Sequence, residues 1–98
     1  MSLAVILRPE AIVDLEVARD MLNAARDGLG QQFITRLREV LERIEAAPEL
    51  HGLVWQDVRA ARLKRFRYVV YFIVGKSRID VLAVLHGARD TSAWQSRA

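Results

Sequence analysis

Residues 68–85 read YVVYFIVGKSRIDVLAVL, and this stretch decides the fold. Its first part, Tyr68–Val74, is almost entirely β-branched or aromatic, which is typical of a strand buried on both faces. Gly75–Arg78 has the composition of a hairpin turn, and Ile79–Leu85 is the next, mostly apolar strand. The pattern therefore predicts a β-hairpin that contributes to the core.

Two amphipathic helices are expected upstream of this hairpin. The first starts near Pro9, because proline suits the first turn of a helix, and the glycines of residues 27–30 (DGLG) stop it. Its apolar side chains are Ile12, Leu15, Leu22 and Ala25. The second helix ends at Ala47-Pro48. Its apolar face consists of Phe33, Ile34, Leu37, Val40, Leu41 and Ile44. We expect the two helices to form an antiparallel hairpin joined by the glycine turn.

Two further strands complete the expected fold. Leu3–Leu7 is a short apolar run, consistent with a buried strand, and Val58–Phe66 mixes apolar and basic residues, as in a strand with at least one face exposed to water. Thr91–Ala98 is expected to be a short polar tail. The order β-α-α-β-β-β predicts one α+β domain over residues 1–98, with the helical hairpin covering one side of a small antiparallel-rich sheet.

Composition excludes several kinds of site. The chain of 98 residues has no cysteine, which rules out disulfides and thiolate chemistry. His51 and His86 lie far apart without ligand-spaced neighbours, and no phosphate loop is present, so we expect no metal and no cofactor. The longest apolar run, Val69–Val74, is too short to span a membrane, and no export leader opens the sequence. We therefore expect a soluble, cytoplasmic protein.

The charges are unevenly placed along the chain. Residues 1–50 hold 6 basic and 9 acidic side chains, a balance of −3, whereas residues 51–98 hold 9 and 3, a balance of +6. The second half would attract an acidic partner, either nucleic acid or an acidic protein. Alternatively, these basic residues only keep a strand-rich half soluble.

Five basic residues concentrate this charge within residues 59–67. They are Arg59, Arg62, Lys64, Arg65 and Arg67. Because side chains alternate along a strand, the five cannot share one face, and some must lie at strand ends or in the turn before Tyr68. They either protect an edge strand against aggregation or form a positive groove for phosphate or carboxylate groups.

A second group of candidate residues follows the last predicted strand. His86, Arg89 and Trp94 come after Leu85, where side chains leave the core. Asp90 either caps the segment after it or pairs with Arg89. Trp94 is either part of a binding site or an anchor that packs the tail on the sheet.

Residues along the whole chain match the sequence pattern of a known protein family. The matching positions are Pro9-Glu10-Ala11, Asp14-Leu15, Gly30, Phe33, Ile44, Pro48, Arg59, Leu63, Arg65-Phe66, Tyr68, Val81–Asp90 and Trp94. The sequence resembles the RelE/ParE toxins of bacterial type II toxin–antitoxin pairs, and most closely the ParE branch. The resemblance covers essentially the whole chain, and its most specific part is VLHGARD at residues 84–90. It implies the same β-α-α-β-β-β fold and a toxin held inactive by a cognate antitoxin in a hetero-oligomer.

The resemblance implies two alternative targets. ParE-like members poison DNA gyrase, whereas RelE-like members cut mRNA on the ribosome. Here Tyr68 is followed by Val69 rather than by the arginine of the RelE pattern, and Trp94 replaces a C-terminal tyrosine. An indole cannot transfer a proton near neutral pH, which favours a gyrase inhibitor without catalysis. Where ParE toxins usually have the proline of an Arg-Phe-Pro-Tyr turn, this sequence has Arg67.

The residues expected to bind the target or the antitoxin are Arg59, Arg62, Lys64, Arg65, Arg67, Arg89 and Trp94. We expect an acidic antitoxin tail that folds on binding to the rims of the helical hairpin and the basic sheet face. In the alternative endoribonuclease, basic residues such as Arg65 would clamp phosphate, Arg89 would stabilise transition-state charge, and His86 would act as acid or base. A third reading is an inert relative that only binds antitoxin.

Overall fold

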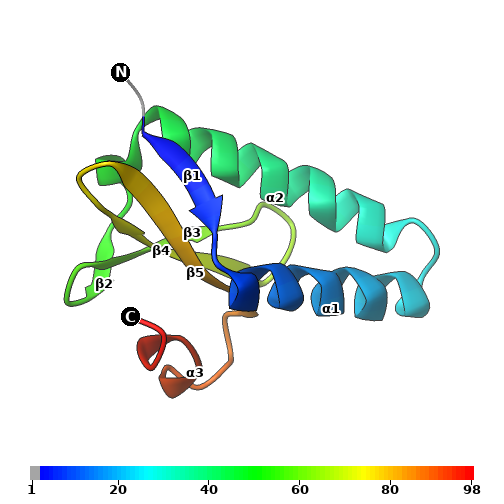
Figure 1. Cartoon of the computed structure of the whole chain (residues 1–98). Helices are drawn as coiled ribbons and strands as arrows, with labels where there is room; N and C mark the ends of the chain where they lie inside the picture. Colours follow the sequence, from blue (N-terminus) through cyan, green and yellow to red (C-terminus); the bar gives the residue numbers. More distant parts are fainter. Residues whose placement is uncertain (1–2) are drawn as a thin grey trace.

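The computed structural model describes residues 3–98 and consists of a sheet with two long helices on one face (Figure 1). In chain order its elements are β1 (Ala4–Leu7), α1 (Pro9–Ala25), α2 (Leu29–Ala46), the 3-10 helix η1 (Pro48–Leu50), β2 (Leu53–Trp55), β3 (Val58–Arg62), β4 (Tyr68–Val74), β5 (Arg78–His86) and α3 (Ser92–Gln95). The α+β fold and the helical hairpin are therefore confirmed.

The five strands form one sheet in the order β1-β5-β4-β3-β2. β1 is parallel to β5, and the other three pairings are antiparallel, so the sheet is antiparallel-rich as expected. In the β4–β5 pair, Tyr71 lies opposite Ala83 but Phe72 lies opposite Val81, so Leu82 is an extra residue that forms a β-bulge.

The sheet carries a hydrophobic cluster on each face. On the helical side, Phe33 and Ile44 of α2 pack with Phe72 of β4. On the other side, Tyr71 of β4 packs with Trp94 of α3. Strand β4 contributes alternate side chains to the two clusters, which confirms that it is buried on both faces.

Two glycines shape the helical hairpin. Gly28 has a φ of 86°, in the left-handed region that glycine adopts without strain, and its N–H donates to Asn23 Oδ1 at 2.9 Å. We expected Gly30 in the turn as well, but α2 already begins at Leu29. A Cβ atom on Gly30 would lie only 2.6 Å from the Arg19 carbonyl oxygen. Gly30 therefore permits close packing of α1 against α2.

The structure differs from the sequence prediction in the second half. Strand β3 ends at Arg62 rather than at Phe66, because residues 63–67 turn back and Arg65 adopts a φ of 71°. Strand β2 was not predicted, and the expected polar tail forms α3, which places Trp94 on the sheet.

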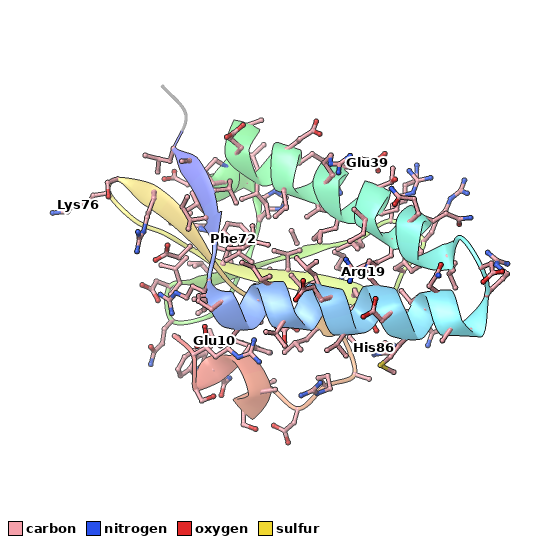
Figure 2. All side chains as sticks on the ribbon, turned by 45° about the vertical axis from the view of Figure 1, so that its right-hand side comes forward. Glu10, Arg19, Glu39, Phe72, Lys76 and His86 are labelled. Atoms are coloured by element: carbon pink, nitrogen blue, oxygen red, sulfur yellow. The ribbon has the colours of Figure 1, made fainter. Side chains whose placement is uncertain are left out.

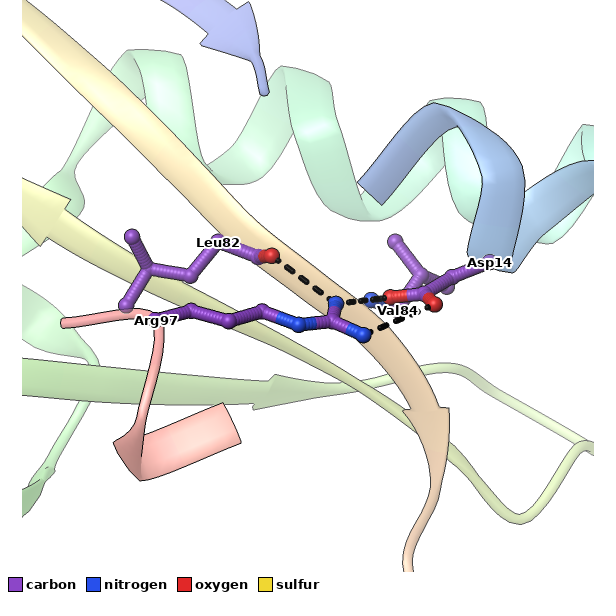
Figure 3. A network of polar contacts seen from close by, with 4 residues as sticks. All are labelled: Asp14, Leu82, Val84 and Arg97. Atoms are coloured by element: carbon purple, nitrogen blue, oxygen red, sulfur yellow. Dashed lines mark hydrogen bonds and ion pairs between the residues drawn. The ribbon is translucent and has the colours of Figure 1, made fainter. Parts of the chain in front are cut away.

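The ion pair between Asp14 and Arg97 covers the part of the β5 edge that has no neighbouring strand (Figure 3). β1 leaves the sheet after Leu7, so β5 has no neighbouring strand on this side beyond Val81. There Asp14 of α1 accepts the Val84 N–H at 3.0 Å, and Arg97 Nη1 donates to the Leu82 carbonyl at 3.2 Å. Side chains thus replace the missing strand at the bulge.

Candidate functional site

A groove of about 850 Å³ opens between the ends of β3, β4 and β5, the loop after β5, and α3. We call it the basic groove and define it by Arg62, Arg67, Tyr68, His86, Thr91 and Trp94. It wraps around this end of the sheet, because Trp94 and its neighbour Tyr71 belong to the cluster on the face opposite the helical hairpin, whereas Tyr68 packs against the cluster on the helical side.

The positive charge of the groove comes from Arg62 and Arg67. Arg62 ends β3 opposite Val69, and Arg67 lies in the turn before β4. The Arg67 carbonyl accepts the Gly87 N–H at 2.7 Å, which holds the loop after β5 against this turn. Both side chains are exposed, and neither forms an ion pair within residues 3–98. Both guanidinium groups can therefore bind an anion.

His86 ends β5 directly opposite Tyr68, and the two rings meet edge to face with centroids 5.5 Å apart. The Nδ1 atom of His86 accepts the Ala88 N–H at 3.0 Å. In the neutral ring the proton must therefore reside on Nε2. His86 thus offers a hydrogen-bond donor to a ligand, while its acceptor nitrogen is already occupied.

Trp94 forms part of the wall beside Tyr71. The two rings stack with centroids 4.4 Å apart, Trp55 meets Trp94 at 6.2 Å, and Trp94 is only 3% exposed. Burial raises the pKa of the Tyr71 phenol above its ordinary value of 10.0, although the nearby charge of Arg62 opposes this. Tyr71 therefore remains neutral at physiological pH and cannot serve as a base.

The structure separates the other candidate residues from the groove. Arg59 Nη1 donates to the carbonyls of His51 at 2.7 Å and Glu49 at 3.4 Å, so it ties β3 to the segment after α2. Arg65 instead lines a separate hollow beside α2, Lys64 is exposed in the turn, and Arg89 is exposed in the loop after β5. Of the predicted site residues, the groove brings together Arg62, Arg67, His86 and Trp94 only.

Two local features complete the site. Asp90 Oδ1 accepts the Ser92 N–H at 2.9 Å, and this bond lowers the pKa of the carboxyl. Asp90 therefore caps the segment that follows it, the first of the two roles expected from sequence. Gly52 and Val54 also line the groove, and sequence reasoning missed them because the three-residue strand β2 has no compositional signature.

Residues 3–98 were expected to hold no metal, and the structure describes two relevant features of this range. No three His, Asp or Glu side chains gather there in a way that could hold a metal ion. Among the helices in this range, none combines the length and the apolar character needed to cross a membrane.

Comparisons with known proteins identify the family of the chain. Residues 5–91 match the family described as ParE toxin of type II toxin-antitoxin system, parDE. The chain is also 30% identical over 74 residues to Toxin ParE2 of Mycobacterium tuberculosis, from both strain CDC 1551 / Oshkosh and strain ATCC 25618 / H37Rv. This alignment covers 76% of the chain and 70% of each relative.

The fold has a counterpart of known structure. A chain of the solved structure titled "Chromosomal ParDE TA system from P. aeruginosa" superposes with a TM-score of 0.77 at 15% identity. The superposition covers 87% of this chain and 96% of that one. Fold and sequence together define a small α+β toxin. The chain belongs to the ParE toxin family and is a ParE-type toxin of a type II toxin–antitoxin system.

Proposed function

We propose that this toxin inhibits DNA gyrase by binding to it, without catalysing a reaction of its own, and that a cognate antitoxin neutralises it. The proposal places the protein in the cytoplasm, where gyrase acts. The observation that carries it is the chemistry of the basic groove, whose lining offers cations and a hydrogen-bond donor but neither a carboxylate nor a free imidazole nitrogen that could accept a proton.

Cleavage of RNA by its own 2′-hydroxyl requires a group that removes the hydroxyl proton. In the groove, the Nδ1 acceptor of His86 is occupied by the Ala88 N–H, and the buried Tyr71 phenol stays protonated. The indole of Trp94 cannot exchange a proton near neutral pH. The groove is therefore better suited to hold an anionic partner than to cut one.

The charge of the groove also supports an acidic antitoxin segment as its occupant. Arg62 and Arg67 are exposed and without an ion-pair partner in residues 3–98, so a carboxylate-rich segment would gain charge-assisted hydrogen bonds there. Such a segment would order on binding and form a hetero-oligomer with the toxin. The remaining predicted contact residues Arg59, Lys64, Arg65 and Arg89 would have to act outside the groove.

The experiment is to incubate the purified toxin with gyrase, plasmid DNA and ATP. We expect supercoiling to be lost or double-strand breaks to be trapped, and added antitoxin to restore activity. The matched variants are Arg62→Ser/Arg67→Ser in the groove and Arg38→Ser/Lys76→Ser on exposed surface elsewhere, each of which removes two positive charges. If gyrase is unaffected while cells producing the toxin stop growing, the gyrase proposal is wrong.

One observation favours a second candidate, the ribosome-dependent endoribonuclease. His86 lies in one groove with two arginines, and as an imidazolium, with Nδ1 protonated and released from the Ala88 N–H, it could protonate the leaving 5′-oxygen of RNA from Nε2. Arg65 and Arg89, the other residues expected for this activity, do not line the groove. Codon-phased cuts in mRNA on programmed ribosomes, abolished by His86→Ala, would support this function. Equal toxicity of His86→Ala and the parent would exclude His86 from the mechanism.

A further inference from the structure

Helix α1 carries an exposed apolar row that nothing in residues 3–98 covers. Val13, Val17 and Met21 are 56%, 52% and 64% exposed. They are spaced four residues apart, so they follow one another along one side of the helix. The residues of α1 that are buried against the rest of the molecule are Ala11 and Ala18. We call the row of Val13, Val17 and Met21 the α1 stripe.

Acidic side chains border the α1 stripe at its start and along one flank. Glu10 precedes Val13 by three residues at the start of the row, and Glu16 and Asp20 lie along its flank. Glu10 and Glu16 have no ion-pair partner within residues 3–98, and Asp20 contacts only the neighbouring Arg19, in an exposed pair at 3.0 Å. The stripe therefore has the opposite charge environment to the basic groove.

The acidic side chains beside the α1 stripe determine which kind of partner can bind to it. Two copies of the chain that paired through their α1 stripes would place acidic rims against each other, and such like-charge contacts are unfavourable. An acidic segment that suits the groove would be repelled for the same reason. A helix with apolar residues at four-residue spacing, flanked by Lys or Arg, satisfies both the apolar row and the carboxylates.

The two surfaces are connected through the C-terminal residues. Arg97, which follows α3, pairs with Asp14 of α1, and its carbonyl accepts a hydrogen bond from Arg8 at 2.6 Å. Trp94 of the same short segment lines the basic groove. Figure 2 shows α3 beside the start of α1, near Glu10. A single partner that leaves the groove along this segment would therefore meet α1, and linked segments bind with a high effective concentration.

We propose that the α1 stripe is the docking surface for a basic, amphipathic helical segment of the antitoxin, separate from the acidic segment in the groove. The inference rests on the proposed antitoxin partnership. The antitoxin tail would then contain two segments of opposite charge: a basic, amphipathic segment that binds α1 and an acidic segment that binds the groove.

The test compares substitutions on the stripe with matched substitutions elsewhere. Val13→Ser/Val17→Ser should weaken antitoxin binding about tenfold, because two half-exposed valines lose their apolar contact. Glu16→Lys should weaken it further at low salt. The controls are Leu50→Ser, at an apolar residue that is 87% exposed after α2, and Glu42→Lys on the exposed side of α2. Both controls should bind like the parent, and all variants should inhibit gyrase equally.

A pair of model peptides tests the charge of the partner directly. Both carry leucine at four-residue spacing, one with flanking lysines and the other with flanking glutamates. The basic peptide should bind the toxin and be displaced by antitoxin, and Glu16→Lys should reverse the preference. The acidic peptide should not bind the stripe.

The outcomes separate this inference from the proposed function. If the parent toxin binds no antitoxin, the proposed partnership fails. If it binds antitoxin and Val13→Ser/Val17→Ser binds equally well, only the α1 docking site is wrong. Loss of gyrase inhibition with antitoxin binding retained would assign the stripe to the target, and conversion of a dimer to a monomer would assign it to self-association. Either result would overturn the inference.

Discussion

Asp14 and Arg97 form a bidentate ion pair, with Arg97 Nη1 2.6 Å from Asp14 Oδ2 and Nη2 3.3 Å from Oδ1. The same Asp14 carboxylate accepts the Val84 N–H, so one side chain joins α1, the β5 edge and the C-terminal segment. The Asp14 side chain is 10% exposed and that of Arg97 is 21% exposed, which shields the pair from much of the screening that weakens surface ion pairs.

Asp14→Ala should destabilise the protein by about 3 kcal/mol, because it removes the ion pair and leaves the Val84 N–H without an acceptor. Asp14→Asn keeps an acceptor oxygen and should cost only about 1 kcal/mol. Denaturant unfolding measures the difference, and Glu16→Ala on the same helix serves as the control. Equal losses for Asp14→Ala and Asp14→Asn would mean that the charge, not the acceptor, matters.

Gly30→Ala should destabilise the protein by about 2 kcal/mol, because a Cβ atom 2.6 Å from the Arg19 carbonyl forces the two helices apart. For a domain of this size such a loss lowers the melting temperature by roughly 10 °C. Gly52→Ala, where a Cβ atom would meet no heavy atom within 4 Å, is the matched control. A melting temperature unchanged by Gly30→Ala would show that α1 and α2 can separate without cost.

The protein should lose stability as the pH falls below about 6.5. Burial, together with the charges of Arg43 and Arg59, lowers the pKa of His51 below its ordinary value of 6.5. Between the lowered pKa and 6.5, the unfolded chain binds more protons at His51 than the folded one, so acid favours unfolding. Thermal unfolding of the parent and His51→Gln across this range measures the effect. The variant should show a smaller decline, and parallel curves would contradict the assignment to His51.

Arg62→Ser/Arg67→Ser should reduce the salt dependence of antitoxin binding. The two exposed guanidinium groups attract an acidic segment most strongly at low ionic strength, so the variant should bind about tenfold more weakly there and nearly like the parent at high salt. Arg38→Ser/Lys76→Ser removes the same charge elsewhere and should have a smaller effect. The same salt slope in the groove variant and the parent would argue against an anionic occupant.

Long apolar segments made most of the fold predictable from sequence. Tyr68–Val74 and the helical face that includes Phe33 and Ile44 have only one plausible periodicity, and both form the expected elements. β2 was not predicted because three residues are too few to show the alternation of a strand. It is defined only by its pairing with β3. β3 ends early because Arg65 adopts a left-handed φ, which composition does not indicate for arginine.

The site was less predictable than the fold. The alternation of side chains indicated that the closely spaced basic residues cannot share one face, but not where each of them lies: Arg59 is held by two backbone carbonyls, and Arg65 lines another hollow. The separation of Arg59 from Arg65 depends on the turn at residues 63–67, whose geometry is set by tertiary contacts. Likewise, Asp14 and Arg97 have no local sequence signature, because their contact depends on how α1 and the C-terminal segment meet the edge of β5.

The parallel pairing of β1 with β5 affects how the toxin folds while it is synthesised on the ribosome. β1 is among the first segments to be synthesised, yet its partner residues 78–81 follow only after both helices and three other strands. The apolar faces of α1 and α2 likewise wait for β4 and β5 to cover them. Long-range contacts of this kind form late in folding. The nascent chain therefore cannot complete the sheet or the groove until most of the polypeptide has emerged, which leaves time for a partner to bind it first.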